Sequence, residues 1–193
     1  MVIGLILEQP KLLTPPQAEP VSLEEVKLAL RITDSAEDSL LQGYIKAARE
    51  YGEDFTGWAF GEETRITFGD AFPRSNFIEL RQYPLIEVIR FSFKDYTGQE
   101  TVLAGGVDYL TDTDSAFGRV VLPYNKNWPG AILYPVSPIR IEFKAGDAAR
   151  LPELYKKAML LHIGIMYRFR DEAIPDPEMQ TIINLYNKYR LRW

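Results

Sequence analysis

The sequence contains no cysteine, a single histidine and no long run of apolar residues. Without cysteine the chain cannot be a disulfide scaffold, and His162 has no second histidine or cysteine with which to share a zinc ion. No stretch reaches the roughly 18 unbroken apolar residues that a membrane-spanning helix needs. The start, MVIGLILEQP, lacks a basic region and meets Glu8 early, so it predicts neither a signal peptide nor a span. We therefore expect a soluble protein.

What the chain does have is a globular composition with an uneven charge. Its 193 residues are 46% hydrophobic and 25% charged, which suits one compact domain. Residues 150–193 carry eight basic against five acidic side chains, whereas residues 1–149 carry 14 basic against 22 acidic ones. An acidic body argues against broad affinity for nucleic acid. The basic end suits an acidic partner or head-to-tail contact between copies, or is simply a helix end favoured by the helix dipole.

The N-terminal part predicts an arm followed by a helical hairpin. Four prolines between residues 10 and 20 indicate that residues 1–20 form an extended arm rather than an element. Ser22 and Glu25 have the spacing of a capping box, and the stretch TDSAED then restarts the helical pattern with Asp34 or Ser35 as cap. Thr56-Gly57 ends the second helix. We assign residues 21–57 to this hairpin.

Residues 62–146 change to a period of two, which is typical of strands. No segment of helix length separates the apolar runs, so pairing should be mostly antiparallel. DYTGQ reads as a hairpin turn and DTDSAFG as a longer one. The expected strands are TRITF, FIEL, IEVIRFSF, ETVL, DYLT, GRVVL and IRIEF.

Helical spacing returns in residues 152–193, with Pro152 in a first turn and Asp176 as a cap. The predicted fold is therefore α+β: a four-helix core, made of two N-terminal and two C-terminal helices, with a central antiparallel β-rich insertion. We treat residues 21–193 as a single domain. The apolar faces give these core candidates: Leu23, Val26, Leu30, Leu41, Ile45, Ala48, Leu154, Ala158, Leu161 and Ile165.

No motif predicts catalysis, and we expect no enzyme, metal or cofactor. His162 lies among leucines and isoleucines in a helical pattern, which favours a satisfied core residue over a ligand. DTDSAFG resembles a calcium loop, but Phe117 stands where glycine is needed and Pro123 where glutamate is needed. A solvated turn explains it better. No pair of carboxylates is singled out as a glycosidase pair.

The C-terminal segment YNKYRLRW combines aromatic and basic residues, which could stack on bases or anchor a protein interface. The acidic body favours the interface. We also expect truncation after Pro175 to leave a folded, soluble chain that no longer assembles. The interface candidates are Tyr186, Lys188, Tyr189, Arg190, Arg192 and Trp193.

The order and spacing of several segments resemble the head–tail connector (adaptor, head-completion) proteins of tailed bacteriophages and prophages. The resemblance covers roughly residues 12–172, and its individual motifs are packing signatures. They are TPPQAEPVSLEEVKLALRI, EDSLLQGYIKAAREYGEDFTGWAF, YPLIEVIRFSF, DYLTDTDSAFGRV, WPG and IRIEFKAGDAARLPELYKKAMLLHIGIMYRFRDE.

The resemblance implies a small helical core with a β-rich insertion, assembled as a ring, expected to be twelvefold, beneath the portal protein in the virion. DNA would pass through the ring without specific binding, and tail or tail-completion proteins would dock on it. No membrane is involved, and the host cytoplasm would hold the protein before assembly. Two other hypotheses stay open: a DNA-binding packaging factor that uses the C-terminal segment, and a carbohydrate-active enzyme or lectin.

Overall fold

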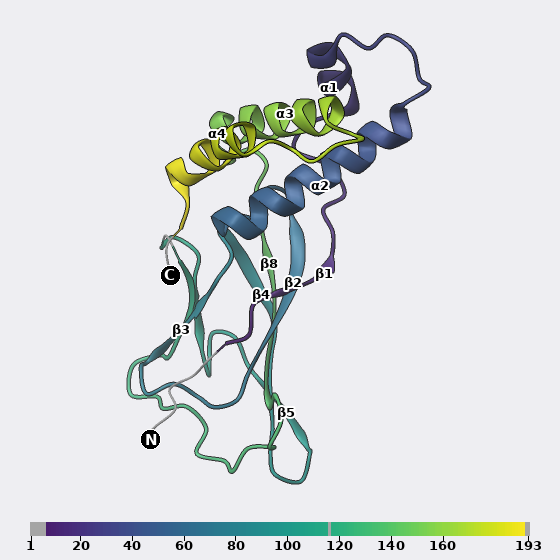
Figure 1. The fold of residues 1–193 in the computed structure, drawn as a ribbon. Coiled ribbons are helices and arrows are strands. Elements are labelled where there is room, and N and C mark those ends of the chain that lie inside the picture. Colours follow the sequence, from purple (N-terminus) through teal and green to yellow (C-terminus); the bar gives the residue numbers. More distant parts are fainter. Residues whose placement is uncertain (1–6, 116, 192–193) are drawn as a thin grey trace. The chain divides into compact units, whose positions relative to one another are not determined.

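The computed structural model describes residues 7–115 and 117–191. Contacts divide the chain into two compact units. The helical unit consists of Gln17–Gly61 and Asp147–Trp193, and the β unit consists of Met1–Pro16 and Glu62–Gly146. Helices near both ends of the chain flank a strand-rich middle (Figure 1), so the α+β prediction is confirmed. Within the described residues, no helix is long and apolar enough to cross a membrane.

Helix α1 (Leu23–Leu30) begins at the predicted capping box. The Ser22 hydroxyl accepts a hydrogen bond from the Glu25 amide, and the Glu25 carboxylate accepts one from the Ser22 amide. These bonds satisfy two backbone donors that a helix start leaves open. Arg31 ends the helix in a left-handed conformation with φ 59°.

Helix α2 (Asp38–Thr56) begins later than predicted. Its cap residue is Glu37, which makes no side-chain capping bond. Asp34 instead accepts from the Ala36 amide inside the preceding turn, so the assignment of Asp34 or Ser35 as cap is wrong. The predicted end is confirmed, because Gly57 follows with φ 76°, a conformation that favours glycine.

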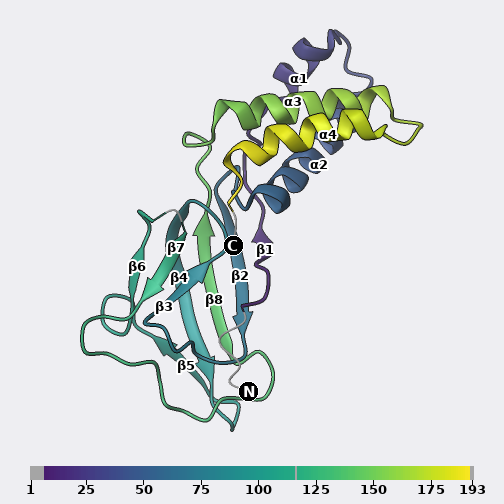
Figure 2. The same cartoon turned by 60° about the vertical axis from the view of Figure 1, so that its left-hand side comes forward.

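Helices α3 (Glu153–Arg168) and α4 (Asp176–Tyr186) complete the helical unit and lie alongside one another (Figure 2). Each follows a proline, and Asp176 is the first residue of α4 rather than its cap. A short 3-10 turn, η1 (Asn187–Tyr189), follows α4.

The core of the helical unit takes residues from all four helices and the connecting segments. Six of the ten core candidates are buried, and Leu23, Leu30 and Leu154 are half-buried. Leu161 is 39% exposed, so its assignment to the core is wrong. Helix α3 packs against α1, α2 and α4, so its buried residues do not follow a single stripe. The buried residues of α3 are Tyr155, Ala158, Met159, His162, Ile163 and Ile165.

A buried ion network lies on α2. Arg49 is 1% exposed, donates to Glu53 at 2.8 Å and donates to Glu19 at 2.9 Å. Burial would lower the pKa of Arg49, but the carboxylates of Glu53 and Glu19 outweigh it and raise that pKa. Glu53 also accepts from the amide of Phe60 at 2.9 Å. The network therefore fastens the segments before α1 and after α2 to the helix.

The β unit contains two sheets, both antiparallel as predicted. A five-stranded sheet has the order β1-β2-β8-β4-β5, and a three-stranded sheet has the order β3-β7-β6. The strands of the first are β1 (Lys11–Thr14), β2 (Glu63–Gly69), β8 (Ile139–Ala145), β4 (Leu85–Lys94) and β5 (Glu100–Leu103). Those of the second are β3 (Phe77–Leu80), β7 (Gly118–Val121) and β6 (Leu110–Asp112).

The β core follows from alternation along the strands. Every second residue of β8 from Ile139 to Ala145 is buried, while the residues between them are half-buried. Ile78, Leu80 and Val120 of the smaller sheet are buried as well. A Cβ atom at Gly118 would overlap the side chain of Leu85, so glycine permits this close approach of β7.

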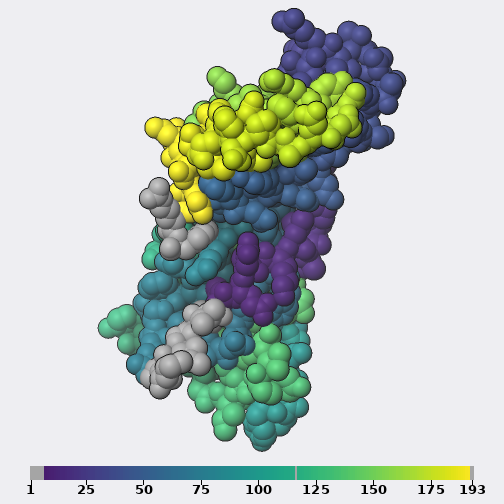
Figure 3. Space-filling view, in the orientation of Figure 1, coloured from purple at the N-terminus to yellow at the C-terminus, as the bar shows by residue number. Residues whose placement is uncertain are grey.

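The Pro-rich arm differs from its prediction in one respect. The sequence predicts an extended arm without an element, but Lys11–Thr14 form strand β1, which pairs with β2. The segment is extended as expected, and the edge of β2 offers free backbone groups that it can pair. Figure 3 shows this N-terminal segment, in purple, exposed on the surface.

Candidate assembly surfaces

The described part of the C-terminal segment is exposed at its side chains and held at its backbone. Lys188, Tyr189 and Arg190 are exposed, Tyr189 by 47%. Arg192 and Trp193 lie outside the described residues. We call Lys188, Tyr189 and Arg190 the C-terminal surface. It presents two cations and a phenol, and of these residues Tyr189 and Arg190 are of the types that anchor interfaces.

The end of α2 holds this surface in place. The indole Nε1 of Trp58 donates to the carbonyl of Tyr189 at 3.0 Å, and the amide of Leu191 donates to the carbonyl of Thr56 at 2.9 Å. The guanidinium of Arg190 lies 4.4 Å from the centre of the Phe55 ring. The backbone is therefore fixed, the side chain of Lys188 faces solvent, and the ring of Tyr189 packs edge-on against Tyr155 with 6.1 Å between ring centres.

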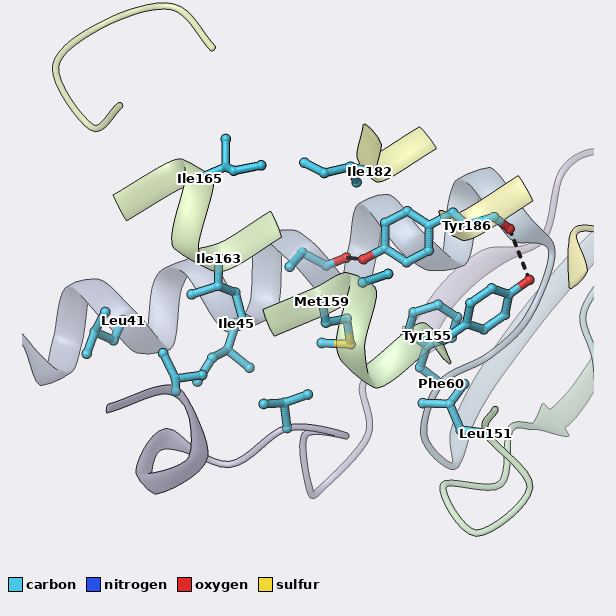
Figure 4. Close-up of a cluster of buried hydrophobic side chains, with 14 residues drawn as sticks. Leu41, Ile45, Phe60, Leu151, Tyr155, Met159, Ile163, Ile165, Ile182 and Tyr186 are labelled. Atoms are coloured by element: carbon cyan, nitrogen blue, oxygen red, sulfur yellow. Dashed lines mark hydrogen bonds between the residues drawn. The ribbon is translucent and has the colours of Figure 1, made fainter. Parts of the chain in front are cut away.

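Tyr186 belongs to the core and not to the surface. It is fully buried, and burial raises the pKa of its phenol above the usual value. Its hydroxyl donates to the carbonyl of Ala48, and its own carbonyl accepts from the hydroxyl of Tyr155 (Figure 4). The structure therefore corrects the prediction that Tyr186 is an exposed interface residue. Its position on a buried helix face is visible in the sequence, because Ile182 lies four residues earlier.

The burial of α4 also corrects the predicted result of truncation. Ile182 and Tyr186 are both fully buried in the core of the helical unit. Removing everything after Pro175 deletes these two side chains and exposes the faces of α2 and α3 beneath them. Such a chain would lose stability rather than assembly alone, so the C-terminal surface has to be tested by substitution.

His162 is buried as predicted, with 4% of its surface exposed. Its ring packs edge-on against Tyr51, with 5.0 Å between ring centres. Burial lowers the pKa of the imidazole to about 4, so the ring is neutral near pH 7. Among the described residues its Nδ1 has no hydrogen-bond partner, so the expectation of a satisfied histidine is not met at this atom.

The turn that resembles a calcium loop uses its carboxylate internally. Asp112 accepts from the hydroxyl of Ser115 at 2.6 Å and from the guanidinium of Arg119 at 2.5 Å. These bonds hold the pKa of Asp112 well below its usual value. Within residues 7–115 and 117–191, no group of three or more His, Asp or Glu side chains could hold a metal ion.

The structure adds a surface that sequence reasoning missed. Tyr96, Ile132, Tyr134 and Val136 are all exposed, Ile132 by 76%. Two backbone bonds hold them together: the Tyr96 amide donates to the carbonyl of Ile132, and the Tyr134 amide donates to the carbonyl of Lys94. We call these four residues the hairpin surface. The run AILYPV within a Gly- and Pro-rich loop is the signal that could have revealed it.

Both surfaces can bury aromatic and aliphatic area against another protein. Exposed apolar side chains held by fixed backbone are typical of contact sites, because little conformational entropy remains to be lost on binding. Neither surface brings together an acid, a base and a nucleophile.

A comparison with protein families matches residues 20–82 to the Phage gp6-like head-tail connector protein family. The matched range includes α1, α2, β2 and β3 and covers 63 of the 193 residues. It confirms the resemblance to head–tail connector proteins that the sequence motifs indicate. No curated protein matches the chain.

Solved structures extend the similarity to nearly the whole fold. A chain from the virion of a native gene transfer agent (GTA) particle matches with a TM-score of 0.76 and 22% identity, covering 96% of this chain and 97% of that one. A chain from the neck of an empty GTA particle with C6 symmetry matches at 0.74 and 22%, covering 97% of both chains. One from the neck of a native particle with C12 symmetry matches at 0.71 and 22%, covering 96% and 97%. At this identity the matches show a shared fold.

Proposed function

We propose that the chain is a structural subunit of a phage-type head–tail connector. One observation carries this: the helical hairpin matches a connector family, and the complete fold matches chains from the virion and necks of GTA particles. The proposed protein is not an enzyme. It acts in the virion, at the interface between head and tail, and resides in the host cytoplasm before assembly.

In this role copies of the chain form a ring, twelvefold in the virion, between the portal protein and the tail. DNA passes through the ring without specific binding, and tail or tail-completion proteins dock on it. The acidic balance of residues 1–149 supports the conduit. A basic lumen would hold phosphates strongly because each neutralised phosphate releases counterions, whereas an acidic lumen does not.

The C-terminal surface contacts the portal protein or the adjacent subunit in this proposal. Lys188 and Arg190 would meet carboxylates of the partner, and Tyr189 would supply buried aromatic area at the centre of the contact. Mass measurement of the purified chain, alone and with the portal protein, tests the role directly. A complex with a fixed number of copies is the expected result, and persistent monomers in both samples would contradict it.

Substitution of residues in the C-terminal surface then tests whether this surface contributes to the interface. Tyr189→Ser with Arg190→Ser removes the edge-on contact of Tyr189 with Tyr155 and the stacking of Arg190 on Phe55. The melting temperature should therefore fall by a few degrees, and the complex should weaken at least tenfold. Lys46→Ser, on the exposed face of α2, is the control and should bind like the unchanged chain. Equal binding by both variants would remove the C-terminal surface from the interface.

The alternative is a DNA-binding packaging factor, favoured by the exposed cations beside Tyr189. Retention of the purified chain on duplex DNA at increasing salt separates the two roles. A connector should elute at low salt, because it makes few phosphate contacts. Strong retention at physiological salt that is lost in the Tyr189 and Arg190 variant would favour the alternative.

A further inference from the structure

The N-terminal arm of the β unit is attached to strand β2 mainly through its backbone. The amide of Glu8 donates to the carbonyl of Phe68 at 2.8 Å, and the hydroxyl of Thr67 donates to the carbonyl of Glu8 at 2.7 Å. The guanidinium of Arg65 donates to the carbonyl of Pro10 at 3.3 Å. Thr67 and Arg65 are buried, and both reach out to backbone atoms of the arm. The edge of β2 therefore recognises an extended backbone.

Side chains also attach the arm, because Pro10 is buried and the ammonium of Lys11 lies 5.5 Å from the centre of the Phe68 ring in β2. All four residues of β1 are exposed, including Leu12 at 38% and Leu13 at 50%. Two exposed leucines on an edge strand are a liability for an isolated chain, because such an edge invites pairing with another molecule. The two leucines are no longer a liability where a neighbouring subunit covers the edge of the sheet.

The connector that follows β1 is suited to reach outward. Residues 15–21, PPQAEPV, contain three prolines, which restrict the backbone to extended conformations. Glu19 is bonded to Arg49 and Val21 is buried, so the unattached part is residues 15–18, which at ~3.1 Å per residue spans about 12 Å. Exchange of an identical element between copies is a low-cost route to assembly, and a short proline-rich connector next to an edge strand permits it.

We propose that residues 7–14 of each copy pair with strand β2 of the adjacent copy in the assembled ring, and this rests on the ring of the proposed function. The exchanged strand makes the same hydrogen bonds as the intramolecular one, so exchange sacrifices no bond. Within a ring the neighbouring edge is held at high effective concentration. Each subunit then links to the next through a strand, and Leu12 and Leu13 lie at the subunit boundary.

The absence of native cysteine makes the test direct. Thr14 and Thr64 are register partners that follow a register shift in β1, and partnered strand residues lie within the Cα range that a disulfide spans. Oxidised rings of the Thr14→Cys/Thr64→Cys variant should yield covalent multimers on a denaturing gel without reductant. The same variant oxidised as a dilute free chain should run as an internally linked monomer.

A mixture of the two single variants sharpens this result. Assembled together, the Thr14→Cys and Thr64→Cys chains should give a disulfide dimer with one of each, at about one subunit contact in four by random placement in a ring. The control is Lys94→Cys/Glu100→Cys, whose positions are partners within the β4–β5 hairpin and should link only within one chain.

The outcomes distinguish the proposed exchange of the N-terminal arm from the proposed connector role. Rings in which the Thr14 and Thr64 thiols join only within one chain would overturn arm exchange and leave the connector role intact. Failure of the unoxidised chain to form rings, measured by mass before oxidation, would overturn the connector role and the exchange with it.

Discussion

The two units treat their apolar side chains differently. In the described residues of the helical unit, the exposed large apolar or tyrosine side chains are Leu28, Leu40, Leu161 and Tyr189, whereas the β unit has twelve such residues. The units are similar in length, so size does not explain the difference. The helical unit buries most of its apolar side chains in its own core. The β unit exposes many of its apolar side chains, which are then available for contacts in an assembly.

The largest effect is expected at the buried ion network of the helical unit. Arg49→Leu leaves Glu53 buried without its cation and should lower the free energy of unfolding by about 3–5 kcal/mol. Urea unfolding measures the loss. Lys46→Leu, whose ion pair with Glu50 is exposed, should change stability by less than about 1 kcal/mol. Similar losses in both variants would show that burial does not set the strength of these pairs.

The same variant tests whether residues 21–193 form a single domain, which stays a prediction. Amide hydrogen exchange resolves the two units separately. In a single domain, Arg49→Leu should accelerate global exchange in the β strands as much as in the helices. Protection that falls in the helices alone would mean that the units unfold independently.

Two residues of α3 compare core and surface within one helix. Met159 is fully buried and Leu161 is 39% exposed. Met159→Ala should cost about 2–5 kcal/mol because it removes buried methylene groups and leaves a cavity. Leu161→Ala should cost less than about 1 kcal/mol. Thermal unfolding monitored by circular dichroism gives both values, and the opposite order would restore Leu161 to the core.

His162 makes the stability of the helical unit depend on pH. Its folded pKa of about 4 lies below the usual value of 6.5, so the unfolded chain binds the proton more readily. The contribution of the neutral imidazole to the free energy of unfolding is complete above pH 6.5. It falls by about 3 kcal/mol as the pH drops to 4. Urea unfolding at several pH values measures this slope. In His162→Leu the slope between pH 6.5 and 4 should flatten, and an unchanged slope would assign it to other groups.

The smallest effect on folding is expected at the hairpin surface of the β unit. Ile132→Ser and Tyr96→Ser replace exposed side chains and should change the free energy of unfolding by no more than about 0.5 kcal/mol. The same variants should enter assembled complexes less readily than the unchanged chain, as measured by co-sedimentation. A variant that loses stability but assembles normally would reverse the roles inferred for the two units.

Local features were predictable from the sequence. The capping box of Ser22 and Glu25 and the end of α2 at Gly57 depend on neighbouring residues, and the bounds of strands β3 and β5 follow from the runs FIEL and ETVL. The strand order could not be predicted. Strand β2 pairs with the distant strand β8, and the sequence of neither strand specifies which strand it pairs with. The division of the strands into two sheets is hidden for the same reason.

The candidate surfaces were predictable only in part. A cluster of basic and aromatic residues indicated the C-terminal surface, but the exposure of each residue depends on packing, which buries Tyr186 and leaves Tyr189 outside. Arg49 shows the converse, since a charged residue is expected on the surface until Glu19 and Glu53 are known to surround it. The hairpin surface requires backbone pairing between residues far apart in sequence.

The register of β2 with β8 has a consequence for how the chain folds. Glu63 lies opposite Ala145, so the second segment of the β unit, Glu62–Gly146, begins and ends beside one strand pair. Before these strands pair, about 96 residues separate α2 from α3, and afterwards only about 13 unpaired residues do, which lowers the entropy cost of bringing the helices together by about 2 kcal/mol. Pairing of β2 with β8 thereby brings α2 and α3, which are distant in the sequence, close together before they pack. Substitutions that weaken the β2–β8 pairing should slow formation of the helical core, although they touch none of its residues.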